Sequence, residues 1–262
     1  MLKDRVKRTV RGVLERFDLS LVQQRHFHDI AEKALIAERL PILDLLDNDE
    51  LRMGIGLVAK SPSQLGQDIV ALKHLEWKRD GFFVDFGATN GRALNNSWLL
   101  EKQFGWSGIL AEPGRMWRDA LAGSGRTAAI EYDCVWNKTG ETLTFSEVGE
   151  LSTISMLAGS DYHASSRAGA KSYEVRTISL NDLLAKHQAP PVIDFLSIDT
   201  EGSEFQILDA LDFSRYRFKV IACEHNYAPE RERIHQLLTG HGYTRKFVAH
   251  SLFDDWYFDD RR

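Results

Sequence analysis

The chain has 262 residues, 43% of them hydrophobic, and a formal net charge of −5. An acidic balance gives no electrostatic case for nucleic-acid binding, so nucleic acid is not an expected partner. No apolar run of about 18 residues predicts a membrane-spanning helix, and the N-terminus lacks the pattern of a secretory signal. The two cysteines, Cys134 and Cys223, are far apart. They argue against a disulfide framework or a structural zinc site and favour the reducing cytoplasm.

The first 50 residues have the periodicity of helices. Apolar residues between Leu2 and Phe17 recur every three or four positions, with lysines and arginines on the opposite side. We expect this basic amphipathic helix to pack against the domain or a second subunit. The alternative is peripheral contact with an anionic surface at the inner face of the membrane, or with an acidic glycan carrier. A second helix is predicted from Ser20 to Leu46, broken near Pro41.

From Ser63 the sequence alternates between strand and helix patterns, which predicts βαβ units and a parallel sheet with helices on both faces. Ser63 is the expected N-cap of the first helix. The predicted helices cover residues 63–78, 96–104, 115–121, 180–187, 204–211 and 230–238. The predicted strands cover residues 81–87, 108–111, 128–132, 173–177, 193–198 and 218–223.

Three other segments stand outside this alternation. Residues 142–145 are predicted to form a further strand, as a hairpin partner. Residues 149–171, rich in serine, glycine and alanine, form a long loop and are a candidate lid or substrate loop. Residues 243–249 and 255–258 are expected to close the chain as an antiparallel pair.

The first motif with chemical meaning is FVDFGATNG, residues 83–91. A buried strand delivers Asp85, and the glycines Gly87 and Gly91 let a ligand approach backbone N–H groups. The G-x-x-x-G spacing lacks the middle glycine of dinucleotide-binding turns, which argues against pyrophosphate binding. An ordinary glycine turn after a strand is the alternative interpretation.

A second acid, Glu112, ends the next predicted strand. Because the two strands are expected to be neighbours, Glu112 would lie beside the glycine turn and could accept hydrogen bonds from two ribose hydroxyls. The alternative is a surface acid at the start of a helix.

Further polar groups follow two later strands. Asp199, Glu201 and Glu204 come after residues 193–198, and such crowding indicates a cation, a positively charged cofactor or a polar substrate. Glu201 and Glu204 could instead be first-turn helix acids. Glu224 and His225 end the next strand, where a histidine could take up a proton near neutral pH, a structural histidine being the alternative.

Taken together and in order, these segments resemble the FkbM-type methyltransferase family. The similarity spans residues 63–258 and is carried by SQLGQD, VDFGATNG, GWSGILAEP, LSIDTEGSEFQIL and the closing GY and DDWYF. It implies a seven-stranded Rossmann-like α/β methyltransferase fold over residues 61–262, with a mostly parallel sheet, preceded by an N-terminal helical extension over residues 1–60. It also implies S-adenosylmethionine as methyl donor and O-methylation of a sugar, a glycan or a related natural product.

The resemblance also implies roles for individual residues. Residues expected to contact the donor are Asp85, Gly87, Thr89, Gly91 and Asn96 around the methionine and ribose, Glu112 at the ribose, and Asp133 near the adenine. Asp199 would lie near the sulfonium and the acceptor. The pair Thr89-Asn90 and the residue Trp136 depart from the usual family pattern, so the turn's side-chain contacts and the adenine pocket are expected to differ.

A hydroxyl acceptor needs a base or a metal to favour loss of its proton. His225 is the first candidate base and Asp199 the second, with Glu224 as a further catalytic candidate. Asp199, Glu201 and Glu224 could instead gather Mg²⁺, which prefers oxygen ligands. The competing hypotheses for the whole chain are a nicotinamide-dependent oxidoreductase, disfavoured by its glycine spacing, and a non-catalytic module in glycan assembly, disfavoured by intact Glu112 and Asp199.

Overall fold

The computed structural model describes residues 33–157 and 171–261. The amphipathic helix predicted between Leu2 and Phe17 and part of the predicted loop 149–171 lie outside these ranges. Within them, no helix combines the length and apolar character needed to cross a membrane.

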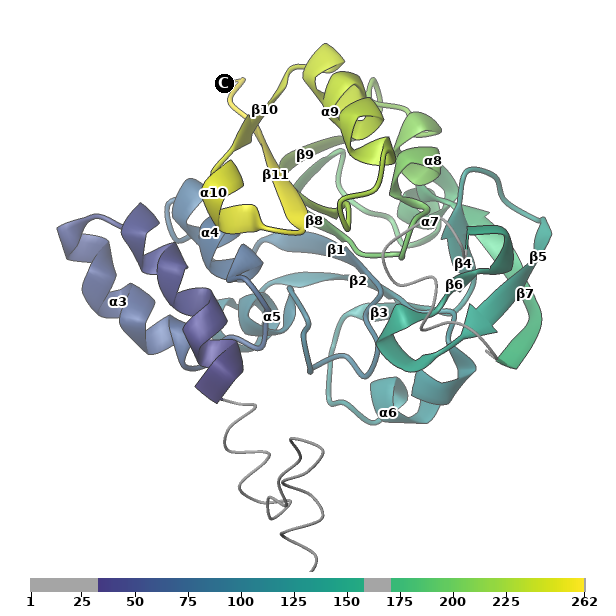
Figure 1. Ribbon diagram of the computed structural model, residues 1–262, viewed down its shortest axis with the longest axis horizontal. Helices are drawn as coiled ribbons and strands as arrows, with labels where there is room; N and C mark the ends of the chain where they lie inside the picture. Colours follow the sequence, from purple (N-terminus) through teal and green to yellow (C-terminus); the bar gives the residue numbers. More distant parts are fainter. Residues whose placement is uncertain (1–32, 158–170, 262) are drawn as a thin grey trace, which may run out of the picture.

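A large sheet forms the centre of the fold (Figure 1). Among the described residues it has seven strands in the order β10-β11-β9-β8-β1-β2-β3, and six of them run in the same direction. Only β11 runs against its neighbours β9 and β10 within this sheet of the described chain. The strands are β1 Phe82–Phe86, β2 Ser107–Ala111, β3 Ala129–Glu131, β8 Val192–Ile198, β9 Arg217–Glu224, β10 Tyr243–Lys246 and β11 Asp254–Asp259. The predicted Rossmann-like α/β fold and its terminal antiparallel pair are confirmed.

Helices cover both faces of this sheet. The α-helices are α3 Asn48–Val58, α4 Gln67–His74, α5 Trp98–Phe104, α6 Arg118–Ala122, α7 Leu180–Lys186, α8 Glu204–Asp209, α9 Glu230–Gly240 and α10 Val248–Ser251. Short 3-10 turns are η1 Leu40–Leu45, η2 Arg115–Trp117, η3 Gly149–Leu151 and η4 Ser155–Leu157. Residues 33–39 are also helical.

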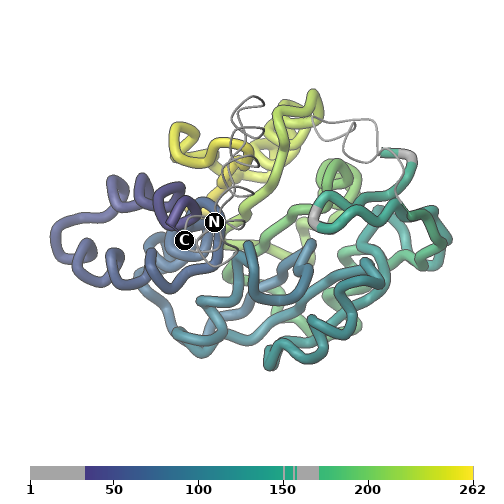
Figure 2. The backbone as a smooth tube through the Cα atoms, turned by 60° about the horizontal axis from the view of Figure 1, so that its bottom comes forward, coloured from purple at the N-terminus to yellow at the C-terminus, as the bar shows by residue number. Residues whose placement is uncertain are grey.

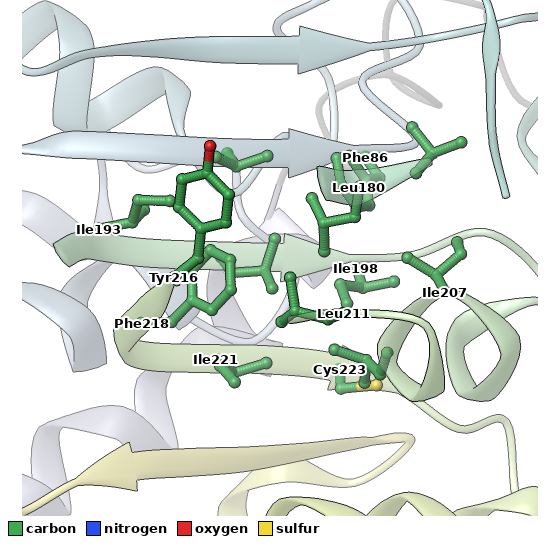
Figure 3. Close-up of a cluster of buried hydrophobic side chains, with 14 of the residues drawn as sticks. Phe86, Leu180, Ile193, Ile198, Ile207, Leu211, Tyr216, Phe218, Ile221 and Cys223 are labelled. Atoms are coloured by element: carbon green, nitrogen blue, oxygen red, sulfur yellow. The ribbon is translucent and has the colours of Figure 1, made fainter. Parts of the chain in front are cut away.

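The central strands are buried on both sides, which explains their nearly continuous apolar sequences. Successive side chains point to opposite faces of a strand. In β1, Val84 and Phe86 therefore join the cluster under α7, α8 and α9, whereas Phe83 joins the cluster under α4 and α5. Figure 3 shows part of the first cluster, to which Phe86, Leu180, Ile198 and Ile207 all belong.

The N-terminal helices pack directly on the domain. Ile42 of η1 and the α3 residues Leu57 and Val58 belong to the same hydrophobic cluster as α4 and α5. Asp47 caps the start of α3 in a reciprocal capping box. Its carboxylate accepts a hydrogen bond from the Glu50 N–H, and the Glu50 carboxylate accepts one from the Asp47 N–H. Residues 40–58 thus share the domain's core, while the division proposed at residue 60 stays a prediction.

One predicted helix break is confirmed and one helix boundary differs from the sequence-based expectation. The helix predicted from Ser20 to Leu46 with a break near Pro41 is helical over the described residues 33–39 and changes to the 3-10 turn η1 at Leu40. The helix expected from Ser63 begins at Gln67 instead, because Gly66 has a left-handed backbone conformation. Ser63 still accepts a hydrogen bond from the Gln67 N–H at 3.0 Å, so its capping group was recognised but assigned to the wrong position.

A smaller sheet lies at the opposite end of the molecule from α3 (Figures 1 and 2). Within the described chain its order is β4-β7-β5-β6, formed by β4 Cys134–Trp136, β5 Thr142–Glu147, β6 Thr153–Ile154 and β7 Lys171–Ser179. The strand predicted at 173–177 exists, but its assignment to the main alternation was wrong. It is part of β7, which pairs antiparallel with β5 and has one largely exposed face over its first half. The hairpin partner predicted at 142–145 is confirmed as β5.

Candidate active site

A cavity of about 410 Å³ lies at the carboxyl ends of the parallel strands. Open α/β sheets bind ligands at this edge, and cavities for small ligands have volumes of roughly 300–1,000 Å³. Gly87 follows β1, Glu112 follows β2, Asp199 follows β8 and Glu224 ends β9, and all four line the cavity. The edge predicted from the four motifs therefore coincides with the cavity.

Glu112 is fixed by the backbone on both of its carboxyl oxygens. Oε2 accepts from the Thr89 N–H at 2.8 Å, and Oε1 accepts from the Gly114 N–H at 2.7 Å. The residue is almost fully buried, and burial raises its pKa to about 7, against the lowering effect of these two hydrogen bonds. Each carboxyl oxygen has a second lone pair, so Glu112 can still accept hydrogen bonds from a ligand.

The turn after β1 passes very close to the loop after β8. Gly87 has a φ of +73°, and a Cβ atom there would collide with the backbone oxygen of Asp199. Gly91 has a φ of +76°, where a Cβ would come within 2.7 Å of Leu121. Thr89, between them, also has a positive φ of 45°, an uncommon conformation outside glycine. The two glycines of the motif are thus required by backbone geometry, and Thr89 contributes its N–H to Glu112.

Asp85 supports this turn from below and is not among the described residues that line the cavity. It accepts hydrogen bonds from Asn95 Nδ2 at 2.9 Å and Ser97 Oγ at 2.6 Å. Arg126 donates to Ser97 Oγ and to the Gly91 carbonyl, at 2.9 and 2.7 Å. Burial raises the pKa of Asp85, partly offset by Ser97. Its geometry is that of a residue that positions the turn.

Asn96 and Asp133 are also absent from the described residues that line the cavity. Asn96 donates to Ser197 Oγ at 3.0 Å, and its buried Oδ1 has no partner within the described chain. Asp133 follows β3, and its N–H donates to Glu131 at 3.1 Å. The residue after it, Cys134, does line the cavity.

Two carboxyl groups meet at the other end of the cavity. Burial raises the pKa of Asp199 to about 6, and a hydrogen bond from Glu224 lowers it in part. Burial, together with the negative charge of Asp199, raises the pKa of Glu224 well above its ordinary value. The two groups titrate as a pair, in which the charge of Asp199 keeps the pKa of Glu224 the higher of the two.

Glu201 completes a group of three acids. Asp199, Glu201 and Glu224 each offer a carboxylate oxygen within 4.8 Å of the others, so the predicted candidate metal set is brought together. Asn226 donates to Glu201 Oε2 at 3.2 Å. The fourth acid, Glu204, is the first residue of α8 and accepts hydrogen bonds from the N–H groups of Thr200 and Gly202, at 3.0 and 3.1 Å, in the loop after β8. This position agrees with the alternative interpretation of Glu204 as an acid in the first turn of a helix.

His225 is turned away from this group. Its Nδ1 accepts from the Tyr227 N–H at 3.0 Å, so Nε2 carries the ring proton and donates to the Asp254 carbonyl at 3.1 Å. Burial, and then the charge of Arg231, lower its pKa. It lines a small neighbouring pocket and is not among the described residues of the main cavity. The structure does not support the sequence-based first choice of His225 as base, because both ring nitrogens are already engaged.

Sequence reasoning missed the residues that roof the cavity. Phe145, Leu151 and Ile154 come from the small sheet and its connections and give the site an apolar cover. Thr153 Oγ1 donates to the Glu201 carbonyl at 2.8 Å and ties this cover to the loop after β8. The absence of a clear period in residues 149–171 was the one available signal, and its first part, at Gly149, does line the cavity.

The fold and the site together define a class. A sheet with this strand order, a glycine turn after its first strand and an acid after its second forms the Rossmann-like methyltransferase architecture that the sequence indicated. The chain belongs to the family described as the methyltransferase FkbM domain, whose model matches residues 85–249. No curated protein sequence matches the chain.

Solved structures with partial similarity to the chain include two proteins. One is a precorrin-6y C5,15-methyltransferase from Geobacter metallireducens GS-15, with 12% identity and a TM-score of 0.40, covering 73% of this chain and 87% of that one. The other is MtNAS. A point mutant of it has 10% identity and a TM-score of 0.38, covering 90% and 74% of the two chains. A complex of MtNAS with MTA and tNA has a TM-score of 0.36 at 10% identity, covering 91% and 74%.

Proposed function

We propose that this protein transfers a methyl group from S-adenosylmethionine to a hydroxyl oxygen of a sugar, a glycan or a related natural product. The observation that carries the proposal is one cavity with a backbone-fixed acid, Glu112, at one end and the carboxyl pair Asp199–Glu224 at the other. The first end suits a ribose, and the second suits a group that loses a proton.

The residues present fit the proposed donor. Glu112 would hold the two ribose hydroxyls, since its oxygens are already oriented by Thr89 and Gly114. The side chains of Cys134 and Val135 provide an apolar wall beside Glu112 that suits an adenine ring. Burial raises the pKa of the Cys134 thiol to about 12, so it acts there as an apolar surface. When bound, the donor supplies an activated methyl group.

Asp199 is the proposed base. As the acceptor oxygen forms its bond to the methyl group and the donor's carbon–sulfur bond breaks, the O–H proton passes to the Asp199 carboxylate. Glu224, holding its own proton, donates a hydrogen bond to Asp199 and orients it. The apolar roof of Phe145, Leu151 and Ile154 limits water at this end, which favours transfer to the acceptor over hydrolysis.

A magnesium ion held by Asp199, Glu201 and Glu224 is the alternative activator, in which case the carboxylates would serve as ligands. A chelator distinguishes the two. If turnover is indifferent to chelation, Asp199 acts as a base, whereas loss of turnover that magnesium restores favours the metal.

The proposal extends to partners and compartment. A soluble hydroxyl compound or a glycan is the expected acceptor, in the cytoplasm or at the inner face of the membrane. Contact with the membrane or with a second copy, through the segment before residue 33 for which the sequence predicts helices, is part of this proposal. Removing residues 1–32 and measuring vesicle binding and oligomeric state would test it.

The deciding experiment is a transfer assay. Purified protein with methyl-labelled donor is incubated with a panel of cell-envelope glycans and simple glycosides, and labelled products are identified by mass spectrometry. We expect label on an ether oxygen. Binding of a nicotinamide cofactor in place of the donor would support an oxidoreductase, and donor binding without transfer to any acceptor would support a non-catalytic module.

A further inference from the structure

Gln64 lines the active-site cavity and belongs to the SQLGQD segment, which precedes residues 85–249, the part of the chain matched by the family model. It is half-buried, and its carboxamide makes no hydrogen bond to other residues of the described chain. The second carboxamide in the described lining, that of Asn226, is already used to hold Glu201. Within the described residues, Gln64 therefore contributes to the cavity lining an amide donor and an amide acceptor that no other side chain or backbone group uses.

The turn that carries Gln64 is held firmly. The carboxamide oxygen of Gln67 accepts from the Leu65 N–H at 3.0 Å and from the hydroxyl of Ser63. Gly66 has a φ of +78°, and a Cβ there would come within 3.3 Å of Ile42. These contacts fix the backbone on both sides of Gln64, so little conformational entropy is lost in the backbone when its side chain binds a ligand.

The same turn is attached to the acceptor end of the cavity. Gln67 Nε2 donates to Asp254 Oδ2 at 2.8 Å, and Asp254 pairs with Glu224 across β11 and β9. The Phe253 carbonyl accepts from the His225 N–H at 2.9 Å, and the Phe253 side chain lines the cavity. Gln64 and Phe253 are therefore both connected to the β9 side, across β8 and β1 from Glu112.

We propose that Gln64 and Phe253 form the sugar-binding part of the acceptor site and that Gln64 determines acceptor specificity. A carboxamide can donate to one hydroxyl and accept from its neighbour, which matches two adjacent hydroxyls of a sugar ring. An aromatic side chain beside it covers the apolar C–H face of such a ring. This inference rests on the proposed function, since it assigns the acceptor to the end of the cavity opposite Glu112.

The test measures binding, so that it does not depend on turnover. The full-length protein is saturated with the unreactive product S-adenosylhomocysteine and titrated with the methyl glycosides of glucose, galactose, mannose and rhamnose, using ligand-observed NMR. The variants are Gln64→Ala and Gln64→Glu, with Gln103→Ala on the exposed surface of α5 as the matched control. Affinity for S-adenosylhomocysteine and the unfolding temperature are measured for each protein.

We expect at least one glycoside to bind the wild type and Gln103→Ala equally. Gln64→Ala should weaken that binding roughly tenfold, because two hydrogen bonds are lost. Gln64→Glu should retain part of the affinity, since it keeps the acceptor oxygen. Affinity for S-adenosylhomocysteine should stay unchanged throughout.

Three results would overturn the inference: equal glycoside binding by wild type and Gln64→Ala, loss of S-adenosylhomocysteine affinity in Gln64→Ala, or no glycoside binding by the wild type. The third result leaves the proposed methyl transfer open to its own assay, because a non-sugar hydroxyl compound could still be methylated. A wild type that binds glycosides through Gln64 but transfers no methyl group would contradict the proposed function and leave this inference standing.

Discussion

The two sides of the cavity differ in the long-range contacts that hold them. On the side of the proposed donor, Glu112 is oriented by the N–H groups of Gly114, two residues away, and Thr89, 23 residues away. On the side of the proposed acceptor, Glu224 faces Asp199 from a neighbouring strand at a similar separation in sequence, and Gln67 and Asp254, 187 residues apart, hold the turn that carries Gln64. The acceptor side therefore depends on a contact between distant segments, which spacing along the sequence does not reveal.

The largest effect is expected at the acceptor end, on turnover. Asp199→Asn keeps the shape of the side chain but removes the carboxylate that accepts the proton. We expect turnover to fall about a hundredfold or more, with donor affinity within a few-fold of wild type. Single-turnover kinetics and calorimetry with S-adenosylhomocysteine provide the two measurements.

Asp209→Asn, on the exposed surface of α8, is the matched control and should turn over normally. Full activity in Asp199→Asn would exclude Asp199 both as base and as an essential metal ligand. A loss of donor affinity as large as the loss of turnover would indicate that Asp199 contacts the donor. The proposed difference between the donor side and the acceptor side of the cavity would then be wrong.

The next effect belongs to the donor end. Glu112→Ala removes the proposed acceptor of the ribose hydroxyls and the partner of the Thr89 and Gly114 N–H groups. We expect donor binding to weaken by about 1–3 kcal/mol, the cost of losing charge-assisted hydrogen bonds. Calorimetry measures this in a variant shown by circular dichroism to be folded.

The exposed Glu174→Ala serves as the control for removing a carboxylate and should bind the donor as the wild type does. Unchanged donor affinity in folded Glu112→Ala would refute the proposal that Glu112, directly after β2, binds the ribose of the donor.

The smallest expected effect is the dependence of donor binding on pH. Burial raises the pKa of Glu112 from 4.5 to about 7, so the carboxylate needed by ribose hydroxyls is lost as the pH falls below that value. Affinity should decrease by up to about tenfold over the first pH unit below 7. The effect on stability has the opposite sign, since ionising this buried group disfavours the fold as pH rises from 4.5 to about 7.

Glu112→Gln removes the contribution of Glu112 to the pH dependence of donor affinity, because the amide does not titrate. The difference in pH slope between wild type and Glu112→Gln is the quantity to compare by calorimetry, and parallel slopes would show that another group is responsible.

Local motifs were enough to predict the residues of the proposed donor side. The glycines at 87 and 91 are needed at positive φ, and the acids Glu112 and Asp199 directly follow buried strands, so their residue types and spacing carry the information. The same reasoning failed for His225, because a strand's end gives its position but not the direction of its ring. The ring is turned by two contacts, to Tyr227 and Asp254, that no spacing encodes.

The sequence by itself determined the α/β class, because short apolar runs of strand length alternate with segments of helical period. It also indicated the edge of the sheet where the cavity lies, because polar residues directly follow those apolar runs. Only the tertiary structure decided that β7 lies outside the main sheet, that Asp85 supports the turn instead of lining the cavity, and that Gln64 and Phe253 line the same cavity. These features depend on contacts between residues far apart in the chain, and such contacts are set by how the layers pack.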